Sequence, residues 1–203
     1  MSCECHERDL AHATPQYRQA LWVVVLLNAG YGIVEMMGGF IAGSQALKAD
    51  ALDFLGDGSI TFLALLALSW SRTWRTRAAL AQGLFLACLG IGVLAATGYR
   101  VLVEQQPEAV LMGGFGLGAL AVNMTAALVL MKHRQGDASV RAVWLFSRND
   151  AIGNAAVVLA AGLVWLSRTP WPDLIVAAGI AALFLHSAWE ILRDAWNERP
   201  NPA

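Results

Sequence analysis

Apolar residues dominate six long stretches of this chain, and short polar segments separate them. The stretches lie at 18–42, 47–70, 77–99, 109–131, 141–167 and 172–191. Each reaches about 20 residues, the length that an α-helix needs to cross a hydrocarbon core of about 30 Å. None shows the ten-residue alternation that is typical of a membrane barrel strand. The pattern therefore predicts an all-α integral membrane protein, a bundle of six transmembrane helices.

Composition supports a lipid environment. The chain is 57% hydrophobic and only 14% charged, whereas a soluble domain carries about a quarter charged residues. The net charge of −1 leaves no basic face for nucleic acid. We expect the lipid bilayer as a partner, no nucleic acid, and a multi-pass location in a bacterial inner or plasma membrane.

The basic residues indicate which side each loop occupies. Six spans place both termini on one side, and ten basic residues flank the spans on that side: Arg8, Arg18, Arg72, Arg75, Arg77, Lys132, Arg134, Arg141, Arg193 and Arg199. The opposite loops hold only Lys48, Arg100 and Arg168. By the positive-inside rule, the N- and C-termini are both cytoplasmic.

The ends of the chain are short and polar. Residues 1–17 have no apolar core, so we expect no cleavable signal there. We expect a cytoplasmic N-terminal tail at 1–17, a transmembrane domain at 18–192 and a short cytoplasmic tail at 193–203, with no C-terminal soluble domain. Asp173 follows Trp171 and Pro172 and is expected to be the N-cap of the last helix.

Three acids interrupt the apolar stretch at 47–70. Insertion of a charged side chain into the membrane interior costs about 2.5–3.5 kcal/mol, so such residues usually have a functional role. At 100° per residue, Asp50, Asp53 and Asp57 form one stripe about 60° wide. Asp53 and Asp57 lie one turn apart, and their mutual repulsion would retain protons that a divalent cation displaces. This predicts metal–proton exchange. Asp50 has a second interpretation, as an outer-interface residue beside Lys48.

Two further apolar stretches carry oxygen ligands. Asp150 and Asn154 share one helix face, and Glu35 shares another with Asn28 and Tyr31. Carboxylate and amide oxygens from several helices predict a pocket for a hard or borderline cation. Two asparagines, Asn28 and Asn123, have an alternative interpretation as hydrogen-bond partners between helices.

Two polar features lie closer to the cytoplasmic side. Cys3, Cys5 and His6 suit transient capture of Zn²⁺ or another thiophilic ion, and the alternative is a flexible tail with incidental cysteines. Arg148 is two residues from Asp150, so the two side chains point about 200° apart on a helix and should not pair. We expect Arg148 to snorkel to the cytoplasmic surface.

The first two apolar stretches carry motifs that resemble those of a known family. The motifs are Val34-Glu35-Met36-Met37-Gly38-Gly39, Gly43-Ser44, Ala49-Asp50-Ala51 and the Asp53–Asp57 pair. Together they resemble the first two membrane helices of the cation diffusion facilitators, and the segment at 149–154 is similar to the family's fifth helix. The resemblance implies export of a divalent metal from the cytoplasm in exchange for protons. It also implies a tetrahedral site shared by the second and fifth helices, usually in a homodimer.

The sequence departs from the family at two points. Phe146 stands where the first ligand of the fifth helix is expected, so only Asp53, Asp57 and Asp150 carry over directly. The fourth ligand is then Asn154, a water molecule or Asp50. The family's cytoplasmic C-terminal domain is expected to be absent, so a homodimer would rest on membrane helices alone.

These patterns lead to one main functional hypothesis. The chain is expected to be a proton-coupled exporter of Zn²⁺, Co²⁺ or Cd²⁺, with no cofactor besides the transported ion. An enzyme is not expected, because no nucleophile or HExxH-type metal set is present. The alternative is a non-transporting metal sensor or an accessory subunit of a metal-resistance system. The sequence does not rank the metals, because oxygen-rich sites discriminate by geometry.

Overall fold

Six helices make up the part of the protein that the structure describes. The computed structural model describes residues 15–67, 72–103, 106–131 and 138–197. In chain order the helices are α1 (Pro15–Ala42), α2 (Gln45–Ala67), α3 (Arg72–Val103), α4 (Ala109–Met131), α5 (Ala138–Ser167) and α6 (Trp171–Asn197). Each predicted apolar stretch coincides with one helix, so the all-α prediction is confirmed.

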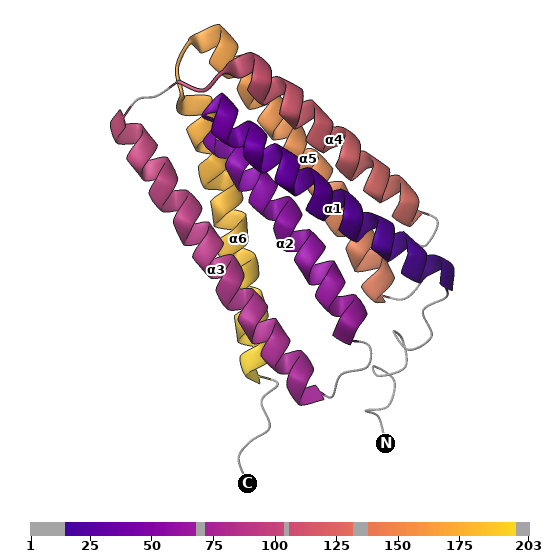
Figure 1. Cartoon of the computed structure of the whole chain (residues 1–203). Coiled ribbons are helices and arrows are strands. Elements are labelled where there is room, and N and C mark those ends of the chain that lie inside the picture. Colours follow the sequence, from indigo (N-terminus) through magenta and orange to yellow (C-terminus); the bar gives the residue numbers. More distant parts are fainter. Residues whose placement is uncertain (1–14, 68–71, 104–105, 132–137, 198–203) are drawn as a thin grey trace.

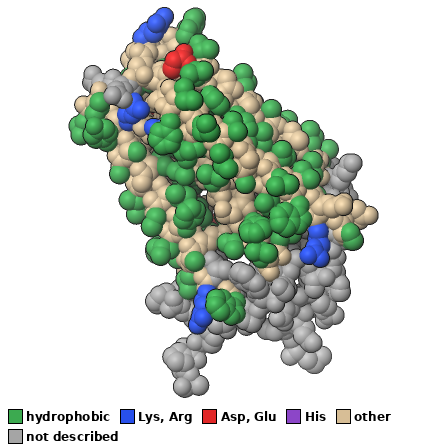
Figure 2. All heavy atoms as spheres, viewed as in Figure 1, with side chains coloured by type: hydrophobic (Ala, Val, Ile, Leu, Met, Phe, Trp, Pro, Cys, Tyr) green, Lys and Arg blue, Asp and Glu red, His purple; other side chains and the backbone are tan. Residues whose placement is uncertain are grey.

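Five of the six helices are long and apolar enough to cross a membrane. The apolar spans run over Arg18–Ala42, Leu80–Val103, Ala109–Met131, Asp150–Ser167 and Trp171–Arg193. In contrast, α2 carries Lys48 and three acids between Gln45 and Asp57, and these charged residues distinguish it from the other helices. On the face shown in Figure 2, hydrophobic side chains cover the middle of the molecule, and basic side chains are seen toward its two ends.

The helices alternate in direction and form two groups. α1, α2, α4 and α5 pack together, while α3 lies along α6 at the side of this group (Figure 1). The most extensive contacts are those of α3 with α6, α1 with α2, and α4 with α5. Among the described parts of the helices, α2 is the one that contacts all five others. The helix that carries the acids is therefore the central helix of the bundle.

A tight turn joins α1 to α2. Gly43 adopts a φ of 66°, a conformation that favours glycine because it has no Cβ. Ser44 follows and caps α2, since its Oγ accepts a hydrogen bond from the Leu47 amide at 3.0 Å. Earlier in α1, a Cβ on Gly32 would lie 3.1 Å from the Ala51 carbonyl oxygen of α2. Glycine at this position lets the two helix backbones approach closely.

Asp173 does not act as predicted. α6 begins at Trp171, and the Leu174 amide already donates to the Pro170 carbonyl at 3.1 Å. The Asp173 carboxylate instead reaches the start of α2, where it accepts hydrogen bonds from the Ser44 hydroxyl at 2.5 Å, the Gln45 amide at 2.8 Å and the Ala46 amide at 3.0 Å. The N-cap prediction is thus wrong, because this buried carboxylate satisfies the free amides of a neighbouring helix.

Two apolar clusters fill the interior. The larger joins α2, α3, α5 and α6 through many small residues, among them Ala46, Ala49 and Ala181. The smaller joins the start of α1 to the ends of α2 and α4, and it includes Val24, Leu65 and Leu130. On α2, the three acids lie between Ala49, which belongs to the larger cluster, and Leu65, which belongs to the smaller one. The acids are therefore flanked by apolar packing on both sides.

Candidate functional site

The acids of α2 face the interior of the bundle. Asp50 is only 3% exposed, and Asp53 and Asp57 are half-buried. Lys48 turns another way, with its Nζ 4.6 Å from the centre of the Phe40 ring. The Asp50 side chain is therefore buried within the bundle, and its interpretation as an outer-interface residue beside Lys48 stays a prediction.

α5 brings a second set of oxygens to α2. The carboxyl group of Asp150 interacts most strongly with that of Asp57 and next with that of Asp53. One turn farther along α5, Asn154 is fully buried. Neither its amide oxygen nor its amide nitrogen has a hydrogen-bond partner among the described residues. Buried polar atoms are nearly always paired in proteins, so this side chain is a strong candidate for contact with an ion or water.

α1 contributes a buried glutamate on the other side of α2. Glu35 is 0% exposed, and its carboxyl group lies in the electrostatic field of Asp50 and, less strongly, of Asp53. Both carboxyl oxygens of Glu35 and the Oδ2 atom of Asp50 accept no hydrogen bond from an N–H or hydroxyl donor within the described chain. The two carboxyl groups can hydrogen-bond to each other when they share a proton. Tyr31 lies beside this pair, but its hydroxyl donates to the Phe115 carbonyl at 2.6 Å.

The asparagines of α1 and α4 are both buried, at 4% exposed each. The Oδ1 atom of Asn28 makes no hydrogen bond to any described residue. The same is not found for the Asn28 amide nitrogen or for Asn123, so the alternative of hydrogen bonds between helices stays a prediction. The Oδ1 atom of Asn28 stays available to a ligand on the same face as Glu35.

Together the carboxyl groups form a row across the bundle. Asp53 interacts with Asp57 and Asp50, so it links the α1–α2 pair, Glu35 and Asp50, to the α2–α5 pair, Asp57 and Asp150. Within the described part of the chain, no three His, Cys, Asp or Glu side chains come together at metal-binding distance. The arrangement is an extended acidic row; we use this name for Glu35, Asp50, Asp53, Asp57 and Asp150.

Several predicted residues lie outside the described part of the structure. The tail residues Cys3, Cys5 and His6 precede its first residue, and the side chains of Phe146 and Arg148 are among those not described within α5. Their predicted roles stay predictions.

Sequence reasoning gave Asp173 the wrong role and did not single out Gln82. Asp173 holds α6 against the start of α2, and the only signal in the sequence was an acid beside a Pro. Gln82 of α3 has a buried amide nitrogen with no hydrogen-bond partner in the described chain. A single polar residue in an apolar stretch gives little indication of its partner, so spacing alone could not predict the contact of Asp173 or the burial of the Gln82 amide.

Long apolar helices around an acidic interior define the class of this molecule, which is a multi-pass membrane protein. The chain belongs to the cation efflux family, the cation diffusion facilitators: residues 21–198 match the cation efflux transmembrane domain. This confirms the family resemblance drawn from the motifs of the first two helices.

Named relatives agree with this assignment. The chain is 30% identical to the zinc transporter ZitB of Escherichia coli strain K12, over 85% of this chain and 59% of the relative. It is 24% identical to the cadmium, cobalt and zinc/H⁺-K⁺ antiporter of Bacillus velezensis, over 91% and 63%. It is 22% identical to the metal cation efflux system protein CzcD of Cupriavidus metallidurans, over 88% and 60%. The chain thus spans about three fifths of the length of these relatives.

Proposed function

We propose that this chain carries a divalent cation of the Zn²⁺, Co²⁺ or Cd²⁺ kind out of the cytoplasm in exchange for protons. The observation that supports this most directly is the acidic row, which runs through an otherwise apolar bundle. Charge in a membrane interior is costly, and such residues commonly mark ion pathways and proton relays. The printed names of the relatives, which include zinc transport and H⁺ antiport, agree with this.

We assign the main ion contacts to α2 and α5. Asp53, Asp57 and Asp150 supply carboxylate oxygens, and Asn154 supplies the unpaired amide oxygen beside them. With Phe146 at the family's usual ligand position, Asn154 is the side chain best placed to complete the set. Glu35 and Asp50 form a second pair that receives the ion or the proton on the α1 side of α2.

Proton coupling follows from the closeness of the acids. Two neighbouring carboxylates repel each other when both are ionised, so the row holds protons when no cation is bound. A divalent cation supplies the opposite charge and displaces those protons. Metal and protons therefore compete for the same oxygens, which makes their movements opposite in direction.

Orientation and assembly form part of the same proposal. All six helices cross the bilayer, α2 included, because its acids face inward. The basic residues place the starts of α1, α3 and α5 on the cytoplasmic side. The chain acts as a homodimer, as the family resemblance implies.

A test in cells separates transport through the acidic row from metal capture by the tail. Wild type, Asp57→Asn and the Cys3/Cys5→Ser double variant are expressed in a bacterium that lacks its own zinc and cadmium exporters, and growth is measured against each metal. We expect Asp57→Asn to abolish resistance and the cysteine variant to retain most of it. Glu190→Gln, at an exposed position of α6, is the matched control for loss of an acid. Resistance that survives Asp57→Asn but is lost with the cysteines would contradict the proposal and favour the sensor or accessory role.

A further inference from the structure

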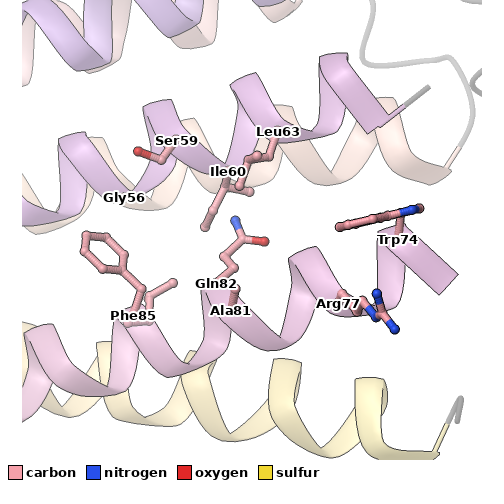
Figure 3. A pocket seen from close by; sticks show the side chains of 10 residues that line it. Gly56, Ser59, Ile60, Leu63, Trp74, Arg77, Ala81, Gln82 and Phe85 are labelled. Carbon is pink, nitrogen blue, oxygen red and sulfur yellow. The ribbon is translucent and has the colours of Figure 1, made fainter. Parts of the chain in front are cut away.

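A lateral groove separates α2 from α3. It has a volume of about 550 Å³, within the range of about 300–1,000 Å³ that is usual for small-molecule sites. Its α2 wall consists of Gly56, Ser59, Ile60 and Leu63, and its α3 wall of Trp74, Arg77, Ala81, Gln82, Phe85 and Leu86. Figure 3 shows the two walls facing each other along the helices. We call this cavity the α2–α3 groove.

The groove is apolar along most of its length. Ile60 and Leu63 of α2 and Phe85 and Leu86 of α3 line it, and Figure 3 shows Phe85 on the side of the groove opposite Gly56. At its deeper end Gly56 leaves open space, since a Cβ built there would meet no atom within 4 Å. A hydrated divalent cation gains nothing from such walls, so the groove does not continue the acidic row. An alkyl chain, by contrast, is stabilised by about 0.8 kcal/mol for each methylene removed from water.

The other end of the groove is basic and interfacial. Trp74 and Arg77 lie just before Leu80, where the apolar span of α3 begins. The Trp74 ring is 59% exposed, and the Arg77 guanidinium stands 5.3 Å from the ring centre. No carboxylate among the described residues forms an ion pair with Arg77. Trp is typical of the membrane–water interface, and an unpaired Arg there suits a phosphate.

A donor lies between these two ends. Gln82 projects from α3 into the space between the helices (Figure 3). Its Nε2 atom is buried and has no hydrogen-bond partner within the described residues. A buried donor of this kind is costly unless a ligand satisfies it. From the end at Arg77 inward, the groove therefore offers a guanidinium group, then the Gln82 hydrogen-bond donor, and then an apolar channel.

We propose that the α2–α3 groove is a binding site for one anionic phospholipid of the leaflet that contains Arg77. The headgroup phosphate binds Arg77 beside the Trp74 ring, an ester carbonyl accepts from Gln82, and one acyl chain lies between Ile60 and Phe85. Basic pockets between transmembrane helices are known to bind anionic headgroups. The site is separate from the ion contacts, and its existence does not depend on the proposed transport.

A second copy of this chain fits the groove less well. A two-fold axis along the bilayer normal would keep the two Arg77 side chains at the same depth, and like charges facing each other are unfavourable. The groove offers no described acid to balance them. The charge of the site is complementary to a phosphate, which is the basis for choosing lipid.

Native mass spectrometry of the whole chain in detergent tests the proposal. The probes are dioleoyl phosphatidylglycerol and dioleoyl phosphatidylcholine, which share acyl chains and differ in headgroup charge. We expect wild type to bind one phosphatidylglycerol several-fold more tightly than phosphatidylcholine. Arg77→Gln should reduce this preference about fivefold, and Ala81→Trp, which fills the groove from α3, should weaken the binding of both lipids.

Controls decide between this site and general attraction to the surface. Arg193→Gln removes an exposed basic residue of α6 outside the groove and should leave the lipid preference unchanged. The proposal is overturned if Arg77→Gln and Arg193→Gln have equal effects, or if Ala81→Trp leaves lipid binding intact. It is also overturned if Ala81→Trp changes the oligomeric mass while lipid binding stays the same, because a second copy would then occupy the groove.

Discussion

At the scale of single residues, the acidic row contains groups that the fold alone does not explain. Glu35 is fully buried, and the group that faces it is the Asp50 carboxyl, with which it can hydrogen-bond only when one of the two holds a proton. Asn154 is fully buried with its whole amide unpartnered in the described chain. Burial without a hydrogen bond costs about 1–3 kcal/mol in proteins. A side chain kept at that cost is expected to serve function at the expense of stability.

Replacement of Glu35 by Met tests this trade-off. Met has a similar length and no polar atoms that need partners, so we expect the purified protein to unfold at a higher temperature, with a gain of about 1–3 kcal/mol. Metal flux in proteoliposomes should fall at least tenfold. Glu190→Gln on the exposed face of α6 should change neither quantity. A less stable Glu35→Met variant would show that the carboxyl group is structural.

Replacement of Asn154 by Leu tests the fourth ion contact. The two side chains have the same number of heavy atoms and the same branching, so the variant should fold, and loss of the unpaired amide should not lower its stability. We expect weaker Cd²⁺ binding by at least tenfold in isothermal titration calorimetry. Asn123→Leu, which alters a buried asparagine of α4 outside the acidic row, is the matched control. Unchanged affinity in Asn154→Leu would remove this residue from the ion contacts.

At the scale of elements, Asp173 determines how α6 meets α2. Its carboxylate accepts hydrogen bonds from Ser44, Gln45 and Ala46 at the first turn of α2. An acid at a helix N-terminus satisfies free amides and complements the helix dipole. Because α6 also packs along α3, this contact joins the α3–α6 pair to the rest of the bundle.

Asp173→Ala should therefore destabilise the bundle by about 2–4 kcal/mol, since it leaves two buried amides and a hydroxyl without their acceptor. Ser44→Ala should cost about 1 kcal/mol. Chemical unfolding in detergent gives both values, and the double variant should lose less than the sum, because the two residues share one hydrogen bond. Strict additivity would show that the contact does not couple the helices.

Much of the architecture could be predicted from the sequence because the membrane imposes a simple rule. A helix must be long and apolar enough to span, so the bounds of α4 (Ala109–Met131) were predictable from hydropathy. The inward stripe of α2 followed from helical periodicity. The cap made by Asp173 was not predictable, because it depends on which neighbouring helix lies alongside, and spacing within one helix carries no such information.

At the scale of the whole molecule, the central position of α2 links architecture to proposed function. α2 contacts every other helix within the described structure, so a shift of α2 on binding of the proposed ion would move its contacts with all five other helices. Its acids face α1 on one side and α5 on the other. The α2–α3 groove opens on yet another side, where few contacts hold the two helices together.

The orientation of the bundle gives a prediction at this scale. If both ends are cytoplasmic, as we propose, a reporter active only in the cytoplasm and fused after Ala203 should be active. The same reporter inserted after Gln106, in the α3–α4 connection, should be silent. A periplasmic reporter at these positions should give the opposite result. Activity of both cytoplasmic fusions would contradict the six-span arrangement.

Counter-transport in proteoliposomes tests the central claim most directly. The purified chain is reconstituted with a metal-sensitive dye and a pH-sensitive dye inside, and Zn²⁺ or Cd²⁺ is added outside. We predict that metal entry is accompanied by proton exit, that an imposed proton gradient accelerates it, and that Asp57→Asn abolishes both signals while Glu190→Gln preserves them. Metal entry without proton movement, or full counter-transport by Asp57→Asn, would contradict the account.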